Sequence, residues 1–231
     1  MNDLDFADLG ALREHEVSSN YDRWSSEKEM KYWLLEILLQ CHEIQVFDEP
    51  RLIDIYDKPA RADIGIVVRR REEYCFFAIE LKHRAQISAN ASAAYSQAYH
   101  YRDMCIVTDD RLPKSVRGRS PSLAFAGLFD MKGIDLNTRC VPHHEHRMIG
   151  MDLLSTHLKV GSVRNYDWRN QVVFYFGEMR LFDINVFTGQ ICWNHVIDNY
   201  IFGSEKRNGS RRVRQSVAER FVEVKTLAEL F

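Results

Sequence analysis

The stretch from Arg61 to Tyr101 constrains the fold of this chain more than any other. Two apolar runs of strand length lie on either side of the charged residues 69–73. The first run is rich in Ile and Val and the second is aromatic and aliphatic, which favours two strands of a buried β-hairpin over a helix. Acidic residues stand at one end of this hairpin, because Asp63 opens the first strand and Glu80 closes the second.

The spacing of Glu80 and Lys82 places both side chains on one face of the second strand, while Leu81 points into the core. Asp63 on the neighbouring strand can bring its carboxylate to the same place. Two carboxylates are hard oxygen ligands of the kind that Mg²⁺ prefers, and the lysine could orient an attacking water or neutralise charge on a phosphate. The alternative interpretation is an ordinary solvated ion pair between Glu80 and Lys82, which contributes little to stability.

The order of these residues resembles the PD-(D/E)xK nuclease superfamily, whose signature is an Asp at the start of one strand and Glu-x-Lys on the next. Here the matching residues are Asp63 and Glu80-Leu81-Lys82, although Ala62 stands where the family commonly has Pro. The resemblance covers roughly residues 25 to 110. It implies a metal-dependent nuclease acting on DNA, with Mg²⁺ or Mn²⁺ at Asp63 and Glu80 and with Lys82 in a catalytic role.

A helix is predicted to begin at Ser26, because Ser26 and Glu29 have the spacing of a capping box and apolar residues follow at helical spacing through Leu38. In the resembled family a first helix often adds an acidic residue to the metal site. Glu29 and Glu36 are the candidates, and Glu29 is preferred as a catalytic residue and metal ligand because it lies in the first turn. The alternative is that Glu29 serves only the cap and that Glu36 is a solvated charge.

A second helix is predicted in the alanine-rich stretch 89–101, followed by a buried strand at 104–108. The helix would connect the Glu80 strand to a parallel partner at 104–108, which gives an α/β fold with a mixed sheet and helices on both faces. Gln97 and Tyr101 lie four residues apart, and Gln-x-x-x-Tyr resembles the RecB-like branch of the superfamily. They could bind a DNA phosphate or a metal-bound water, or be a surface amide beside a half-buried phenol.

Basic loops provide candidate contacts to a nucleic-acid backbone, although the formal net charge of the chain is only −2. One such loop spans 109–121 and another spans 204–214, and either can equally be a solvated loop. The arginines that we assign to nucleic-acid binding are Arg84, Arg117, Arg119, Arg211 and Arg212.

The chain divides into three predicted parts. Residues 1–24 form an acidic extension, 25–135 form the nuclease-like core with its restriction-endonuclease-like mixed sheet, and 136–231 form a C-terminal antiparallel β extension that ends in a helix. Three histidines between His143 and His146 follow Cys140, but their spacing matches no established zinc pattern, so exposed or DNA-facing imidazoles are favoured.

Composition places the chain among ordinary globular proteins of 231 residues, with 45% hydrophobic and 28% charged side chains. No apolar run has the ~20 residues of a membrane span, and the acidic start lacks a secretory signal. Five cysteines stand singly, mostly in apolar runs, which predicts buried free thiols in a reducing compartment and therefore a cytoplasmic location. A homo-oligomer remains open.

Two classes of function follow from these patterns. The first is a Mg²⁺-dependent deoxyribonuclease, with the choice between endonuclease and exonuclease left open. The second is a catalytically silent module of the same fold that binds nucleic acid or a protein partner. A silent module commonly loses one of the three signature residues, and all of Asp63, Glu80 and Lys82 are present. A third reading is an interaction protein stabilised by zinc at the histidine cluster.

Overall fold

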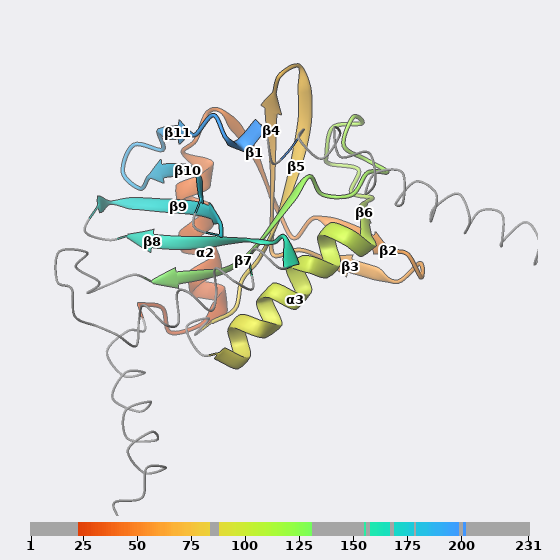
Figure 1. The fold of residues 1–231 in the computed structure, drawn as a ribbon, viewed down its shortest axis with the longest axis horizontal. Helices are drawn as coiled ribbons and strands as arrows, with labels where there is room; N and C mark the ends of the chain where they lie inside the picture. The colour runs from red at the N-terminus through yellow and green to blue at the C-terminus, as the bar shows by residue number, and fades with distance from the viewer. Residues whose placement is uncertain are drawn as a thin grey trace, which may run out of the picture.

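The fold contains two helices and two sheets within the part of the chain that the computed structural model describes, which comprises residues 23–83, 88–130, 155, 158–166, 169–177, 179–198 and 201. The helices are α2 (Glu27–Leu39) and α3 (Ser88–Met104). The large sheet has eight strands, ordered β1-β4-β5-β7-β8-β9-β10-β11, and the small sheet has three, ordered β3-β2-β6 (Figure 1). The chain is therefore an α/β protein with a large mixed sheet.

The first half of the large sheet contains the predicted hairpin and its neighbours: β1 (Ile44–Asp48), β4 (Ile64–Arg70), β5 (Glu73–Glu80) and β7 (Leu123–Asp130). β1, β4 and β5 are successively antiparallel, and β5 pairs with β7 in parallel. The turn between β4 and β5 is shorter than the charged stretch suggested, because Arg70 already pairs with Glu73. Arg71 and Glu72 form this two-residue turn with φ angles of 49° and 77°, the left-handed conformation typical of tight hairpins.

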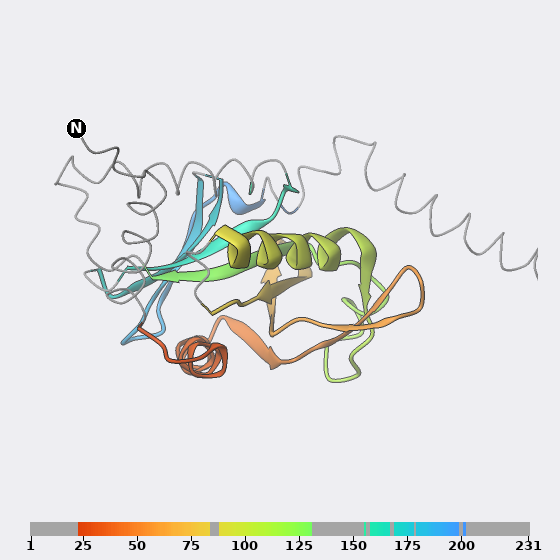
Figure 2. The same ribbon diagram turned by 90° about the horizontal axis from the view of Figure 1, so that it is seen from below.

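The two helices cover opposite faces of the large sheet, as Figure 2 shows. Alternate strand residues build two separate cores. Ile66, Phe77 and Ile79 pack with buried residues of α2, and Val67, Phe76 and Ala78 pack with Ala94, Tyr95 and Ala98 of α3. The predicted mixed sheet with a helix on each face is confirmed.

The predicted parallel partner of the Glu80 strand is wrong. The short strand β6 (Cys105–Val107) directly follows α3 but joins the small sheet, where it pairs antiparallel with β2 (Arg51–Asp54). The parallel partner of β5 is the later strand β7. β7 carries Ala124 and Ala126 under α3, and these small side chains let the helix lie close to the sheet.

The two strands on either side of Pro50 belong to different sheets. β1 belongs to the large sheet and β2 to the small one, so they do not form a hairpin. Glu49 adopts a φ of 46° directly before Pro50, and this sharp corner directs the chain from one sheet to the other. β3 (Pro59–Arg61) then pairs with β2 and leads directly to Asp63.

The C-terminal strands continue the large sheet. They are β8 (Gly161–Tyr166), β9 (Gln171–Phe176), β10 (Met179–Asn185) and β11 (Ile191–Trp193). β8 pairs in parallel with β7, and β8 to β11 follow as an antiparallel meander. The antiparallel strands predicted within residues 136–231 are confirmed for β8 to β11, and the boundary predicted at residue 135 falls between two strands of one sheet.

Three of the predicted buried thiols, Cys41, Cys75 and Cys105, are buried and free, whereas Cys192 is free and exposed. Cys140, the histidine cluster and the predicted C-terminal helix lie outside the described residues. No helix among the described residues has the length and apolar character needed to span a membrane.

Candidate functional site

The ends of β4 and β5 bring Asp63, Glu80 and Lys82 together. Asp63 directly precedes β4, and its Oδ2 atom accepts a 2.6 Å hydrogen bond from the backbone N–H of Leu81. Glu80 closes β5, and its Oε1 atom lies 2.8 Å from Lys82 Nζ. Leu81 between them is buried on the α2 side. The strand alternation therefore sorts the chain here into two polar site residues and one core residue, as the sequence predicts.

Helix α2 adds a third carboxylate to this end of the sheet, and it is Glu27. Its Oε1 atom lies 3.6 Å from Lys82 Nζ, and its Oε2 atom accepts a 3.3 Å hydrogen bond from the backbone N–H of His83. Glu27 is the first residue of α2, so its side chain projects from the end of the helix beside the strand ends. Sequence reasoning missed Glu27, although its position directly after the N-cap was the available signal.

Glu29, the acidic residue predicted for this role, is placed differently. Its carboxylate accepts hydrogen bonds of 2.8 Å and 2.6 Å from the backbone N and the Oγ of Ser25. The N-cap itself is confirmed, because Ser26 Oγ accepts from the backbone N–H of Glu29. Glu29 thus serves the helix start, and Glu36 lies exposed further along the same helix. Neither takes the position beside Lys82 that Glu27 occupies.

Tyr101 and Gln97 on α3 support Glu80 from the other side of the site. The Tyr101 hydroxyl lies 2.9 Å from Glu80 Oε2 and 2.6 Å from the backbone carbonyl of Arg61. It also accepts a 2.7 Å hydrogen bond from Gln97 Nε2. Tyr101 is 1% exposed, so its hydroxyl is directed inward, where it orients Glu80 and is itself oriented by Gln97. Gln97 is exposed, and its contact with nucleic acid stays a prediction.

The electrostatics of the site disfavour two ionised carboxylates. Burial and the nearby Asp63 carboxylate raise the pKa of Glu80 to about 7, against the opposing effect of Lys82 and Tyr101. Burial also raises the pKa of Asp63, although the Leu81 N–H and Lys82 partly offset it. Burial lowers the pKa of Lys82, but the hydrogen bond to Glu80 raises it. The net shift is upward, so the amine stays protonated. A further cation at the carboxylates would therefore favour their ionised forms.

Asp63 and Glu80 are the candidate metal ligands. Among the described residues, no three His, Cys, Asp or Glu side chains gather closely enough to form a metal site by themselves. Mg²⁺ does not require such a cage, because it commonly binds one or two carboxylates and completes its octahedron with waters and substrate phosphates. The donor set therefore fits a hard divalent ion that is held jointly by protein and substrate.

The predicted nucleic-acid contacts fall into three groups. Arg84, Arg211 and Arg212 lie outside the described residues. Arg117 is engaged within its own loop, where its guanidinium donates to the backbone carbonyls of Leu112 and Asp110. Arg119 is exposed and stays a prediction.

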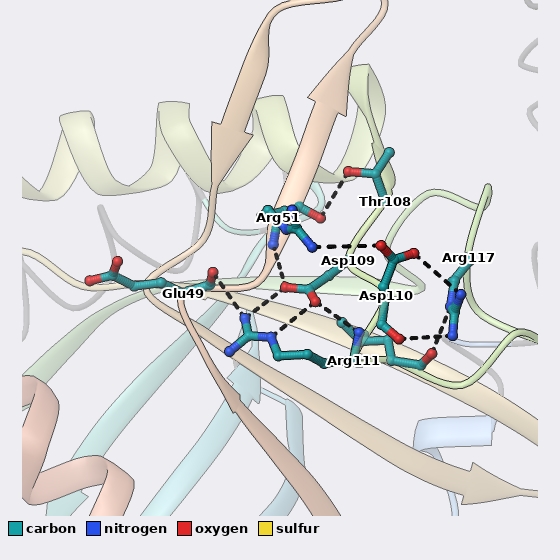
Figure 3. Close-up of polar contacts among 8 residues, drawn as sticks. Glu49, Arg51, Thr108, Asp109, Asp110, Arg111 and Arg117 are labelled. Atoms are coloured by element: carbon teal, nitrogen blue, oxygen red, sulfur yellow. Dashed lines mark hydrogen bonds and ion pairs between the residues drawn. The ribbon is translucent and has the colours of Figure 1, made fainter.

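The basic loop after β6 is held by a buried carboxylate, Asp109, which Figure 3 shows at the centre of a polar network. Asp109 is fully buried and accepts four N–H bonds, one from the backbone of Arg51 and three from the backbone and guanidinium of Arg111. Arg111 also donates to the backbone carbonyl of Asp48. These contacts tie the loop to the corner between β1 and β2, and sequence reasoning missed them because they join residues about 60 positions apart.

The chain matches no protein-family model, no curated protein and no solved structure. The functional argument therefore depends on the geometry of this site.

Proposed function

We propose that this chain is a metal-dependent nuclease of the PD-(D/E)xK type that hydrolyses phosphodiester bonds in DNA. The observation that supports the proposal most is the convergence of Asp63, Glu80 and Lys82, with a 2.8 Å contact between Glu80 Oε1 and Lys82 Nζ. Asp63 and Glu80 would hold Mg²⁺ or Mn²⁺. When bound, the ion would supply Lewis-acid activation of a water and neutralisation of charge at the scissile phosphate.

Lys82 provides a fixed positive charge beside the carboxylates. Its raised pKa keeps the amine protonated, so it acts as a donor and charge stabiliser toward a phosphate oxygen. Its side chain is 28% exposed, whereas that of Glu80 is 2% exposed. The ammonium therefore borders solvent, from which a substrate would approach, while Glu80 is held behind it.

Glu27 and Tyr101 position these two groups. Glu27 holds the Lys82 ammonium from the α2 side, and Tyr101 holds the second oxygen of Glu80 from the α3 side. Neither the helix contact nor the tyrosine contact is needed for an ordinary solvated ion pair. Their presence favours a preorganised site over the alternative of a chance pair at a strand end.

The proposal is tested by digestion of plasmid, linear duplex and single-stranded DNA with Mg²⁺, Mn²⁺, Ca²⁺ or EDTA. We expect cleavage with Mg²⁺ or Mn²⁺, slow or no cleavage with Ca²⁺ and none in EDTA. Cleavage that persists undiminished in EDTA contradicts the metal mechanism. Binding of DNA without cleavage under every condition favours the silent nuclease-fold module instead.

Lys82→Ala separates the catalytic interpretation from a structural ion pair. We expect single-turnover cleavage to fall by about 10²-fold or more, since a charge-stabilising group is removed. The fold should persist, because Glu80 can take up a proton when its cationic partner is lost. Lys58→Ala, which removes an exposed lysine beside the small sheet, is the control. Normal cleavage by a folded Lys82→Ala protein contradicts the proposed role of Lys82.

A further inference from the structure

A shallow groove of about 520 Å³ runs beside the first turns of α2. Its residues on the helix recur at spacings of three and four, so they follow one outward side of it. The groove is lined by Arg23, Trp24, Ser26, Lys28, Glu29, Tyr32, Trp33 and Glu36. Unlike the core-facing side of α2, this side brings aromatic rings and charged groups together at the surface.

The aromatic rings in the groove are paired with cations. The rings of Trp24 and Trp33 lie with their centroids 5.1 Å apart, and the guanidinium carbon of Arg23 lies 4.6 Å from the Trp33 centroid. Lys28 Nζ lies 5.8 Å from the centroid of Tyr32, whose side chain is exposed, with a residue exposure of 51%. The groove thus offers π faces next to positive charges, which is the combination that binds unpaired nucleotides.

The groove is linked to the candidate active site by the polar contacts of His83. The Nε2 atom of His83 lies 2.7 Å from the backbone carbonyl of Trp24, and since a carbonyl can only accept, Nε2 carries the proton. The backbone N–H of His83 donates to Glu27, whose other oxygen lies near Lys82. One residue, His83, therefore separates the Trp24 backbone in the groove from the lysine of the site.

We propose that this groove stacks an unpaired base of the strand whose phosphate lies at Lys82, which makes the substrate single-stranded DNA or a duplex with a single-stranded end. This inference rests on the proposed nuclease function and names its substrate class. Arg23 and Lys28 meet the flanking phosphates, while Tyr32 and Trp33 supply the ring faces. The exposed carboxylate of Glu36 repels a phosphate and can accept an N–H from a base edge. A continuous duplex keeps its bases stacked on one another and presents no free face to these rings.

Binding in EDTA tests the groove without dependence on cleavage. Fluorescein-labelled single-stranded and blunt duplex oligonucleotides are titrated with the wild-type chain and with Trp33→Leu and Tyr32→Ser. We expect single-strand affinity to fall by about 5- to 140-fold in each variant, the range for losing one base–aromatic stack, with duplex affinity unchanged. Phe187→Ser, which removes a ring that is 74% exposed in the turn after β10, is the control.

A single abasic position moved along the oligonucleotide gives the sharper test. The wild-type chain should lose affinity when the abasic position reaches the groove, and Tyr32→Ser should not respond to that position. Tyr32→Ser decides the test if Trp33→Leu does not fold, because Trp33 packs partly against the core. Equal single-strand binding by wild type and Tyr32→Ser overturns the inference. Aromatic clusters can also bind quaternary ammonium groups, so preferential binding of a trimethyl-lysine peptide overturns it too.

The two proposals fail in different ways. Base-dependent binding that needs Tyr32, with no cleavage under any metal condition, supports the groove and overturns the nuclease function. Metal-dependent cleavage whose rate and affinity do not depend on Tyr32 or Trp33 supports the nuclease function and overturns the groove.

Discussion

Glu80 at the end of β5 and Asp109 in the loop after β6 are both buried carboxylates, yet their pKa values shift in opposite directions. Glu80 is 1% exposed and its pKa is raised to about 7 by burial and by Asp63. Asp109 is 0% exposed, and the guanidinium and backbone of Arg111, with the backbone of Arg51, hold its pKa well below its usual range. Burial alone therefore does not decide the charge of a carboxylate in this protein.

The difference lies in the number of donors and in the second carboxylate, Asp63, that acts on Glu80. Asp109 accepts four N–H bonds, three of them from Arg111 (Figure 3). Glu80 has one ammonium and one hydroxyl, and it faces a second carboxylate. A carboxylate with a complete set of donors stabilises a loop, whereas one with an incomplete set remains responsive to an added cation or proton.

Glu80→Gln should have the largest effect, because it removes a proposed metal ligand. We expect cleavage to fall by about 10³-fold or more. The stability of the variant, by contrast, should rise relative to that of the wild type as pH increases. The folded-state pKa of Glu80 is about 7 and its unfolded value is about 4.3, so the folded chain binds more protons in that interval and wild-type stability falls as pH rises through it. The variant lacks this loss.

The measurements for Glu80→Gln are single-turnover cleavage and thermal melting in EDTA between pH 4.5 and 8. As pH rises from 4.5 to 8, the melting temperature of the wild type should fall relative to that of the variant. Glu73→Gln at the exposed start of β5 is the control and should leave both quantities unchanged. A difference in melting temperature that does not change between pH 4.5 and 8 would contradict the raised pKa of Glu80.

Asp109→Asn should have the converse signature, a loss of stability of about 2 kcal/mol with cleavage changed only a few-fold. An amide cannot accept from Arg51 and Arg111 as the carboxylate does, and hydrogen bonds to charged groups contribute more than neutral ones. The folded-state pKa of Asp109 is lowered, so its stabilisation is present above its unfolded pKa of about 3.9 and declines as pH falls below that value.

Urea unfolding of Asp109→Asn at pH 7 and at pH 3.5 measures both parts of this prediction. The free energy of unfolding of the variant should be lower than that of the wild type by the full amount at pH 7 and by a smaller amount at pH 3.5. Asp110→Asn is the matched control, because the neighbouring Asp110 side chain is 80% exposed. An equal deficit at both pH values would mean that the charge of Asp109 is not the source of its stabilisation.

Tyr101→Phe should have the smallest effect, about a tenfold loss of cleavage rate and about 1 kcal/mol of stability. The change leaves the Arg61 carbonyl and Glu80 without their shared hydroxyl donor. Because the hydrogen bond from Tyr101 lowers the pKa of Glu80, its loss should shift the acidic limb of the pH–rate profile to higher pH. Tyr99→Phe on the same helix is the control, and an unshifted profile would show that Tyr101 does not act through Glu80.

Local patterns in the sequence predicted much of the fold and of the site. The apolar spacing of α2, the Ser26 cap and the period-two alternation that brings Glu80 and Lys82 to one face all depend on residues within a few positions of each other. Asp63 could be placed beside them because the two strands of a hairpin are neighbours, so the start of the first strand lies next to the end of the second.

Features that depend on distant partners could not be predicted in the same way. The apolar sequence of β6 would also suit the large sheet. β6 joins the small sheet because β2 lies beside it and pairs with it. The burial of Asp109 could not be predicted from its neighbours in sequence, because it depends on the distant backbone of Arg51. The choice of Glu27 over Glu29 depends on how the first turn of α2 meets the strand ends, since both are acidic residues of that turn.

The separation of the two cores by alternate residues of β5 makes the site sensitive to changes in chain length. Phe77 and Ile79 face α2, while Ala78 faces α3 on the same side as Glu80. Deletion of one residue within β5 turns every side chain on one side of the deletion to the opposite face of the sheet. Leu81 would then leave the core on the α2 side, or Lys82 would enter it. Viable length variation among related chains is therefore expected in the hairpin turn at Arg71 and Glu72, and never between Cys75 and Lys82.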